Sequence, residues 1–162
     1  MAAVTVFFRR AYPVLAGELM TPLTVQYGEA PRSPVLPDVF DVVRVGLGLG
    51  LRAVDHLAET KRAAGPFLRC RLHSVLLIPV DFGSADRWRA PHSECSRHTT
   101  VETIRCGQGY DPACQSRVWV EPLGLKTCAV TDSVALHDVL SLQRSRLARG
   151  AWQSPVREPS RV

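Results

Sequence analysis

The stretch from Phe67 to Phe82 constrains the fold of this chain more than any other part of the sequence. In its first half, Leu68, Cys70 and Leu72 alternate with polar residues, which is the period of a β-strand with one buried face. Its second half, at residues 75–78, is continuously apolar, as in a strand covered on both faces. The pattern therefore predicts one long strand, of which the second half is the more deeply buried.

Shorter patterns on both sides of this stretch predict further strands and two helices. One helix is expected from Leu51 to Arg62, because its apolar residues share one face and residues 64–66 (Ala-Gly-Pro) stop it. A second is expected to begin at a capping Thr131 or Asp132 and to run to about Arg149, where Gly150 closes it. Further strands are predicted at residues 4–12, 23–27, 99–106 and 117–121, and loops at residues 29–37 and 83–98.

This order of elements predicts an α+β fold: a small, mostly antiparallel sheet of about five strands with two main helices packed on it. At 162 residues the chain fits one domain, which we expect to cover residues 1–150. Residues 151–162 are rich in proline, serine and arginine and predict a disordered basic tail.

Three glycines, Gly46, Gly48 and Gly50, precede the first predicted helix. They belong either to one weakened helix from Asp38 or to a strand, a glycine turn and a helix. A cost of about 1 kcal/mol for each glycine inside a helix favours the second interpretation.

The segment Val42–Leu51 followed by a helix resembles the first motif of class I S-adenosylmethionine methyltransferases, and the resemblance extends over residues 40–78. It implies a cofactor site at the three glycines. The chain departs from the family in having Arg44 where an acid is usual and in placing Asp81 later than the ribose-binding acid. It also lacks the further alternating strands and helices of that fold.

A metal site is the second candidate for chemistry. His92, Cys95 and His98 follow one another at intervals of three residues, and Cys106 and Cys114 lie beyond. Zinc takes four nitrogen or sulfur ligands, so this set predicts a zinc site as one alternative. The other is a set of ordinary loop histidines and buried free thiols. No GxSxG, HExxH or P-loop motif is present to name a reaction.

Composition limits the kinds of partner and the cell compartment that we expect for this protein. The net charge of +5 is spread along the chain, and no apolar run has the length of about 20 residues that spans a bilayer. Five cysteines, an odd number, without a secretion signal favour reduced thiols and therefore the cytoplasm or nucleus. Arg9 and Arg10 in an acid-free N-terminal segment leave a mitochondrial presequence as an alternative.

Taken together, these patterns predict a small non-enzymatic accessory or interaction protein, lineage-specific or viral, that acts through a protein or RNA surface. No cofactor is expected under this hypothesis. The alternatives are an S-adenosylmethionine-binding, methyltransferase-like fragment and a zinc-containing nucleic-acid-binding protein.

Overall fold

The computed structural model describes residues 27–30, 32–107, 109, 114–122 and 128–152. These residues form one six-stranded sheet with two α-helices, which confirms the predicted α+β fold with one strand more than expected. None of the described helices combines the length and apolarity needed to cross a membrane. The strands are β1 (Tyr27–Glu29), β2 (Phe40–Gly46), β3 (Phe67–Cys70), β4 (Val75–Val80), β5 (Ser93–His98) and β6 (Arg117–Pro122); the helices are α1 (Leu47–Glu59), α2 (Ser133–Trp152) and the short 3-10 helix η1 (Val101–Thr103).

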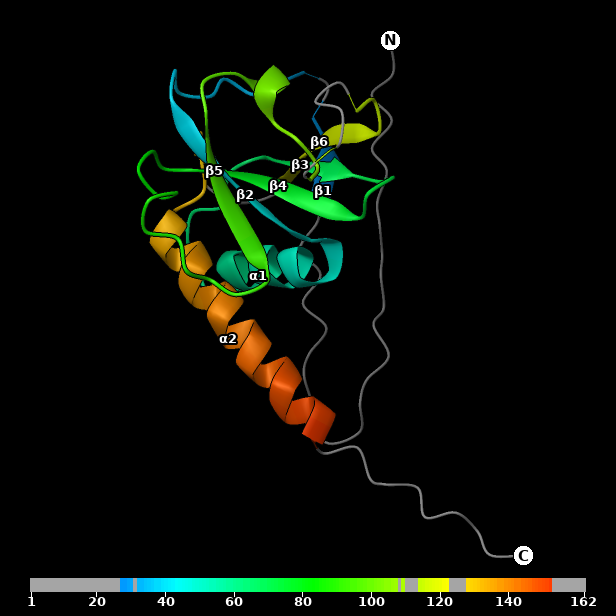
Figure 1. Ribbon diagram of the computed structural model, residues 1–162, viewed down its shortest axis with the longest axis vertical. Coiled ribbons are helices and arrows are strands. Elements are labelled where there is room, and N and C mark those ends of the chain that lie inside the picture. Colours follow the sequence, from blue (N-terminus) through cyan, green and yellow to red (C-terminus); the bar gives the residue numbers. More distant parts are fainter. Residues whose placement is uncertain (1–26, 31, 108, 110–113, 123–127, 153–162) are drawn as a thin grey trace, which may run out of the picture.

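The strands lie in the order β1-β6-β3-β4-β2-β5, and every pair of neighbours is antiparallel. Strands β2 and β3, which α1 connects, both pair antiparallel with β4, so they run parallel to each other with β4 between them. Figure 1 shows α1 and α2 together on one side of the sheet, with α2 extending beyond it. The sheet therefore has one face covered by helices and one face that other segments must cover.

The helix-covered face holds the larger apolar core. Val43 and Val45 of β2 and Ile78 of β4 point toward Leu57 of α1 and Leu136 of α2, and all five are almost completely buried. Burying each such side chain contributes about 1.5–3 kcal/mol. The apolar stripe at 3.6-residue spacing on α1 is what places that helix on the sheet.

The opposite face of the sheet carries a second apolar cluster. Phe40, Leu68 and Leu77 project from three neighbouring strands, and they contact Ile104 from the segment between β5 and β6. Among the described residues of that segment (99–107, 109 and 114–116), η1 is the only regular element. Their apolar contribution to this cluster comes from Val101, Ile104, Cys106 and Cys114.

The stretch from Phe67 to Phe82 is two strands rather than one, which corrects the prediction of a single long strand. Strands β3 and β4 pair through Cys70 and Val75, so residues 71–74 make the turn of a hairpin. The reversal is possible because Ser74 adopts a left-handed conformation with φ of 51°. No glycine, proline or asparagine marks this turn, and the periodicity continues across it, so the pattern alone gave no sign of a break.

Three further predictions differ from the structure. Residues 83–98 were expected as a loop but contain the edge strand β5, and residues 99–106 were expected as a strand but contain η1. The second helix, whose Ala135 N–H does bond to the capping Asp132 carboxylate, continues through Gly150 to Trp152 instead of ending there. A helix tolerates one glycine at a cost of about 1 kcal/mol. The strand predicted at residues 4–12 and nearly all of the predicted tail lie outside the described residues.

Candidate metal centre

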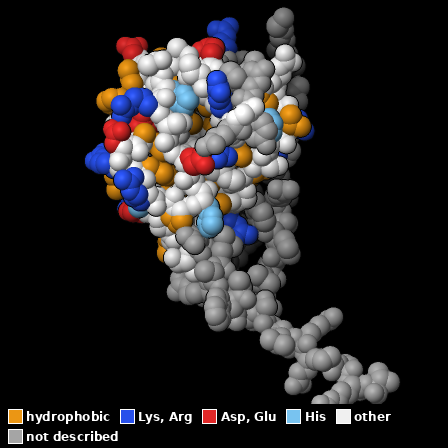
Figure 2. Space-filling model, in the orientation of Figure 1, with side chains coloured by type: hydrophobic (Ala, Val, Ile, Leu, Met, Phe, Trp, Pro, Cys, Tyr) orange, Lys and Arg blue, Asp and Glu red, His pale blue; other side chains and the backbone are white. Residues whose placement is uncertain are grey.

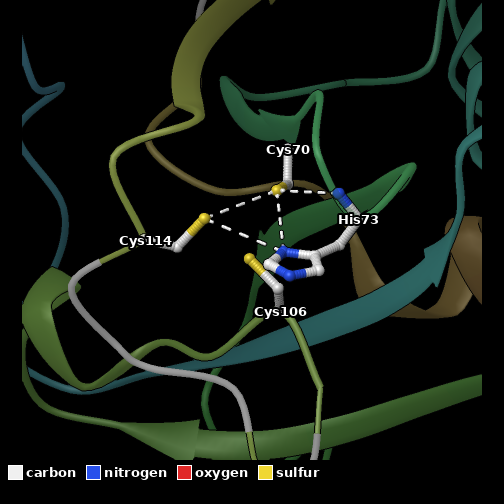
Figure 3. Close-up of side chains that lie close together, drawn as sticks. All are labelled: Cys70, His73, Cys106 and Cys114. Atoms are coloured by element: carbon white, nitrogen blue, oxygen red, sulfur yellow. Dashed lines mark hydrogen bonds between the residues drawn. The ribbon is translucent and has the colours of Figure 1, made fainter.

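Four side chains that can bind a metal converge on the sheet face opposite the helices (Figure 3). Cys70 is the last residue of β3, and His73 lies in the hairpin turn that follows it. Cys106 comes three residues after η1, and Cys114 lies three residues before β6. The hairpin thus supplies two of the four groups, and residues 99–116 supply the other two.

The ligand atoms of these four residues lie within 4.8 Å of one another. The Sγ atoms of Cys70 and Cys114 are 3.8 Å apart, and His73 Nδ1 lies 3.2 Å from Cys70 Sγ and 3.8 Å from Cys114 Sγ. For a tetrahedral zinc ion with bonds of about 2.3 Å to sulfur and about 2.0 Å to nitrogen, the ligand atoms are separated by about 3.5–3.8 Å. The separations among Cys70, His73 and Cys114 are close to this range, and Cys106 Sγ lies within 4.8 Å of each of them.

The hairpin turn adds a feature that suits a thiolate ligand. The backbone N–H of His73 donates a hydrogen bond to Cys70 Sγ, at 3.4 Å. Such a bond stabilises negative charge on the sulfur and fixes the turn that brings the imidazole back toward it. Cys70 and His73 therefore form a preorganised pair with a spacing of three residues.

The pKa values of Cys106 and Cys114 are shifted in opposite directions. Burial, followed by the neighbouring Cys70 and Cys114 thiols, raises the pKa of Cys106 to about 12. A backbone hydrogen bond from Ser116 lowers the pKa of Cys114. A cation held between the sulfurs would favour the thiolate form of a buried cysteine such as Cys106. Bound zinc would supply that cation and would take the sulfurs as thiolates.

Arg117 connects the two segments that carry Cys106 and Cys114. Its Nε donates to the carbonyl of Cys114 at 3.1 Å, and one of its terminal nitrogens donates to the carbonyl of Ile104 at 2.7 Å. Arg117 also lies opposite Cys70 in the pairing of β3 with β6. A single guanidinium thus holds the backbone beside two of the sulfur ligands.

We expect Arg117→Met to weaken zinc binding by about tenfold or more, because groups that orient metal ligands typically contribute 10–100-fold to affinity. The affinity is measured by competition with a chromophoric chelator. Arg105→Met is the matched control, since Arg105 is exposed and adjoins Cys106. Equal losses of zinc affinity in both variants would show that positive charge near the site, and not the hydrogen bonds of Arg117 to the two carbonyls, determines the affinity.

The structure places the five metal ligands predicted from sequence in two regions. Cys106 and Cys114 lie in the cluster, whereas His92, Cys95 and His98 do not. Cys95 packs into the helix-side core, so the sheet separates it from Cys106. Burial, followed by the charges of Asp41 and Asp86, raises the pKa of Cys95 to about 12.

The two histidines have other surroundings. His92 is exposed and adopts a φ of 57° just before β5. His98, at the end of β5, lies 2.9 Å from the hydroxyl of Ser96 and 2.9 Å from that of Thr103. It also stacks on Phe40. These contacts give His98 a role in holding η1 against the sheet.

The glycines of the methyltransferase-like motif lie at the junction of β2 and α1. Strand β2 ends at Gly46 and α1 begins at Leu47, so Gly48 and Gly50 are in the first helical turn and no glycine turn intervenes. A hollow of about 400 Å³ adjoins Gly46, and an Arg44–Glu94 ion pair of 2.8 Å lies on its wall. Gly48 and Gly50 are not among the residues that line this hollow, and Gly50 is buried.

Gly50 has a packing role that Gly48 lacks. A Cβ at Gly50 would come within 2.8 Å of both Leu76 and Val45, whereas a Cβ at Gly48 would meet nothing within 4 Å. We therefore expect Gly50→Ala to lower the free energy of unfolding by about 1–3 kcal/mol through overpacking. Gly48→Ala should be neutral or stabilising by up to about 1 kcal/mol. Urea denaturation of both variants measures the difference, and equal effects would contradict the packing role.

Sequence reasoning missed Cys70 and His73 as metal ligands. Their spacing, Cys-x-x-His, is as close as that of His92 and Cys95, but they fell inside what was predicted as one continuous strand. Only the hairpin turn brings them to the same point. No protein-family model, curated protein or solved structure matches this chain, so the cluster is interpreted from its own geometry.

Proposed function

We propose that this chain is a small, non-enzymatic interaction protein whose fold is stabilised by one zinc ion at Cys70, His73, Cys106 and Cys114. The observation that carries the proposal is the convergence of one nitrogen and three sulfur atoms within 4.8 Å. Reduced thiols are required, which is consistent with action in the cytoplasm or nucleus.

The number of ligands favours a structural metal over a catalytic one. Catalytic zinc sites keep one of four positions open for water or substrate, and structural sites fill all four with protein atoms. Here four side chains are available, and Cys70 and Cys106 are fully buried. The zinc would link Cys106 and Cys114 to the sheet face opposite α1 and α2.

The test is metal analysis of the chain purified under reducing conditions. One zinc per chain is expected, together with loss of stoichiometric zinc in Cys106→Ser. Cys95→Ser is the control, because Cys95 is a part-buried cysteine that packs on the other face of the sheet, outside the cluster. Zinc that is absent from the wild-type chain, or lost equally in both variants, would refute the proposal.

Single-stranded RNA is the second candidate partner, and one observation favours it. The hairpin turn beside the cluster exposes Arg71 and Leu72, with Leu72 69% exposed, and Arg105 is exposed next to Cys106. Arginines with an exposed apolar side chain suit phosphates and bases together. Over the face shown in Figure 2, in contrast, basic and acidic side chains are interspersed.

Fluorescence anisotropy with a labelled single-stranded RNA separates the two partner classes. RNA binding predicts an affinity that falls with salt, with a logarithmic slope of about −0.7 for each phosphate contacted. It also predicts that the double variant Arg71→Gln, Arg105→Gln binds RNA more weakly than the control Arg87→Gln. Arg87 is exposed in the loop before β5. Absence of binding at low salt would leave a protein as the partner.

A further inference from the structure

We propose that Cys70 and Cys114 form a disulfide when the zinc-bound chain meets a hydroperoxide, and that this reaction releases the zinc. The inference rests on the proposed zinc function and assigns a regulation to the same site. The redox state would then decide whether Cys114 is linked to β3 through a zinc ion or through a disulfide with Cys70.

The sulfur atoms of Cys70 and Cys114 are close enough for a disulfide to form after a small movement. Cys70 Sγ and Cys114 Sγ lie 3.8 Å apart, and Figure 3 shows them facing each other. A disulfide needs a separation of about 2.05 Å, so the two sulfurs must approach by about 1.8 Å. Cys114 lies in a non-helical segment before β6, where the backbone is not held in a strand ladder. It is the more adjustable of the two.

Exposure decides which sulfur reacts first. Cys70 and Cys106 are fully buried, whereas Cys114 is only partly buried. A small hydroperoxide therefore reaches Cys114 before the other two. Cys95 and Cys128 are also partly buried, but they do not belong to the cluster and have no cysteine sulfur close enough to form a disulfide among the described residues.

The chemistry balances with one hydroperoxide. The Cys114 thiolate attacks a peroxide oxygen, so that an S–O bond forms, the O–O bond breaks and hydroxide leaves as water after protonation, giving a sulfenic acid. The Cys70 sulfur then attacks Cys114 Sγ, forming the S–S bond and expelling a second water. Two thiolates lose two electrons in all, one hydrogen peroxide gains them, and two protons are consumed.

Zinc release follows from the loss of ligands. Both sulfurs of the disulfide cease to be thiolates, so the zinc keeps only His73 and Cys106. Two ligands do not hold zinc in a structural site, which requires four. Reduction of the disulfide would restore the full set, and zinc would bind again.

The experiment treats the reduced, zinc-loaded chain with hydrogen peroxide. Zinc release is followed with a chromophoric chelator, and disulfides are mapped by mass spectrometry of unreduced peptides. We expect one zinc released per chain, a Cys70–Cys114 linked peptide, and recovery of zinc binding after a reductant and zinc are added. Release without this disulfide, or with a Cys70–Cys106 disulfide, would overturn the inference.

Two variants sharpen the result. Cys114→His retains four ligands but removes the reactive sulfur, and zinc release by peroxide should be slower by about tenfold or more. Cys95→Ser should release zinc at the wild-type rate. If Cys114→His does not hold zinc, the disulfide map of the wild-type chain still decides the question.

The two proposals fail in distinguishable ways. A chain that binds zinc and forms no Cys70–Cys114 disulfide refutes the redox inference and leaves the zinc function intact. A chain that never binds zinc refutes the zinc function and the release, whether or not the disulfide forms.

Discussion

Removing the metal with a strong chelator is expected to lower the Tm of the reduced chain by about 8–16 °C. Zinc present at about a thousand times its Kd stabilises the folded state by about 4 kcal/mol. For a chain of this length, each kcal/mol corresponds to a Tm shift of about 2–4 °C. The effect is a decrease in stability rather than loss of the fold, because the helix-side core does not include any of the four proposed ligands.

Scanning calorimetry with and without the chelator measures this shift. The variant Cys106→Ser should melt close to the chelated wild-type chain and should not respond to the chelator. His92→Ala is the control, since His92 is exposed and outside the cluster, and it should respond as the wild type does. A wild-type Tm unchanged by the chelator would mean that the cluster contributes no metal-dependent stability.

Phe67→Ala is expected to lower the free energy of unfolding by about 3–5 kcal/mol, the usual cost of removing a fully buried aromatic ring. Phe67 is completely buried in the helix-side core and makes an edge-on contact with Tyr27, at 6.0 Å between ring centres. Tyr27 also bonds through its hydroxyl to Asp55 of α1. The ring therefore contacts the residue that connects β1 to the helix.

Urea denaturation in zinc-containing buffer provides the measurement. Phe82→Ala is the matched control, because Phe82 is 56% exposed and its ring contacts Arg97 at 4.6 Å; it should cost less than about 1 kcal/mol. The folded Phe67→Ala chain should still bind one zinc, since Phe67 and Cys70 lie on opposite faces of the sheet. Similar losses in the two variants would contradict the assignment of the core.

The sequence predicted the class of the fold because periodicity reports which faces are buried. Strand β6 and the capping of α2 by Asp132 follow from local spacing and capping. Helix α1 was predicted only in part: it was expected at residues 51–62 and spans Leu47–Glu59, because Gly48 and Gly50 belong to the helix and not to a turn. The edge strand β5 (Ser93–His98) could not be predicted in this way, because its residues are mostly polar. One face of the strand is exposed, and the other carries only weakly apolar side chains. Such a strand is formed by pairing with β2 rather than by its own pattern.

The candidate metal centre was only half predictable. Cys106 and Cys114 were predicted as ligands and lie in the candidate cluster, but which residues lie beside them depends on the face of the sheet that each residue occupies. Cys70 is on the same face as Cys106, whereas Cys95 is on the other. A one-residue change in strand register reverses that assignment, and distant pairings determine the register. Local sequence therefore could not show whether Cys70 or Cys95 lies beside Cys106.

The position of β6 has a consequence for the order in which the chain can fold. Strand β6 is the last in sequence, yet it lies between β1 and β3 and pairs with both. Until residues 117–122 have been synthesised, β3 has one unpaired side and β1 has no partner strand in the described sheet. Pairing between strands that are far apart in the sequence slows folding. A chain emerging from the ribosome would therefore hold an incomplete sheet until β6 has emerged. During that interval an exposed strand edge is most open to pairing with another chain.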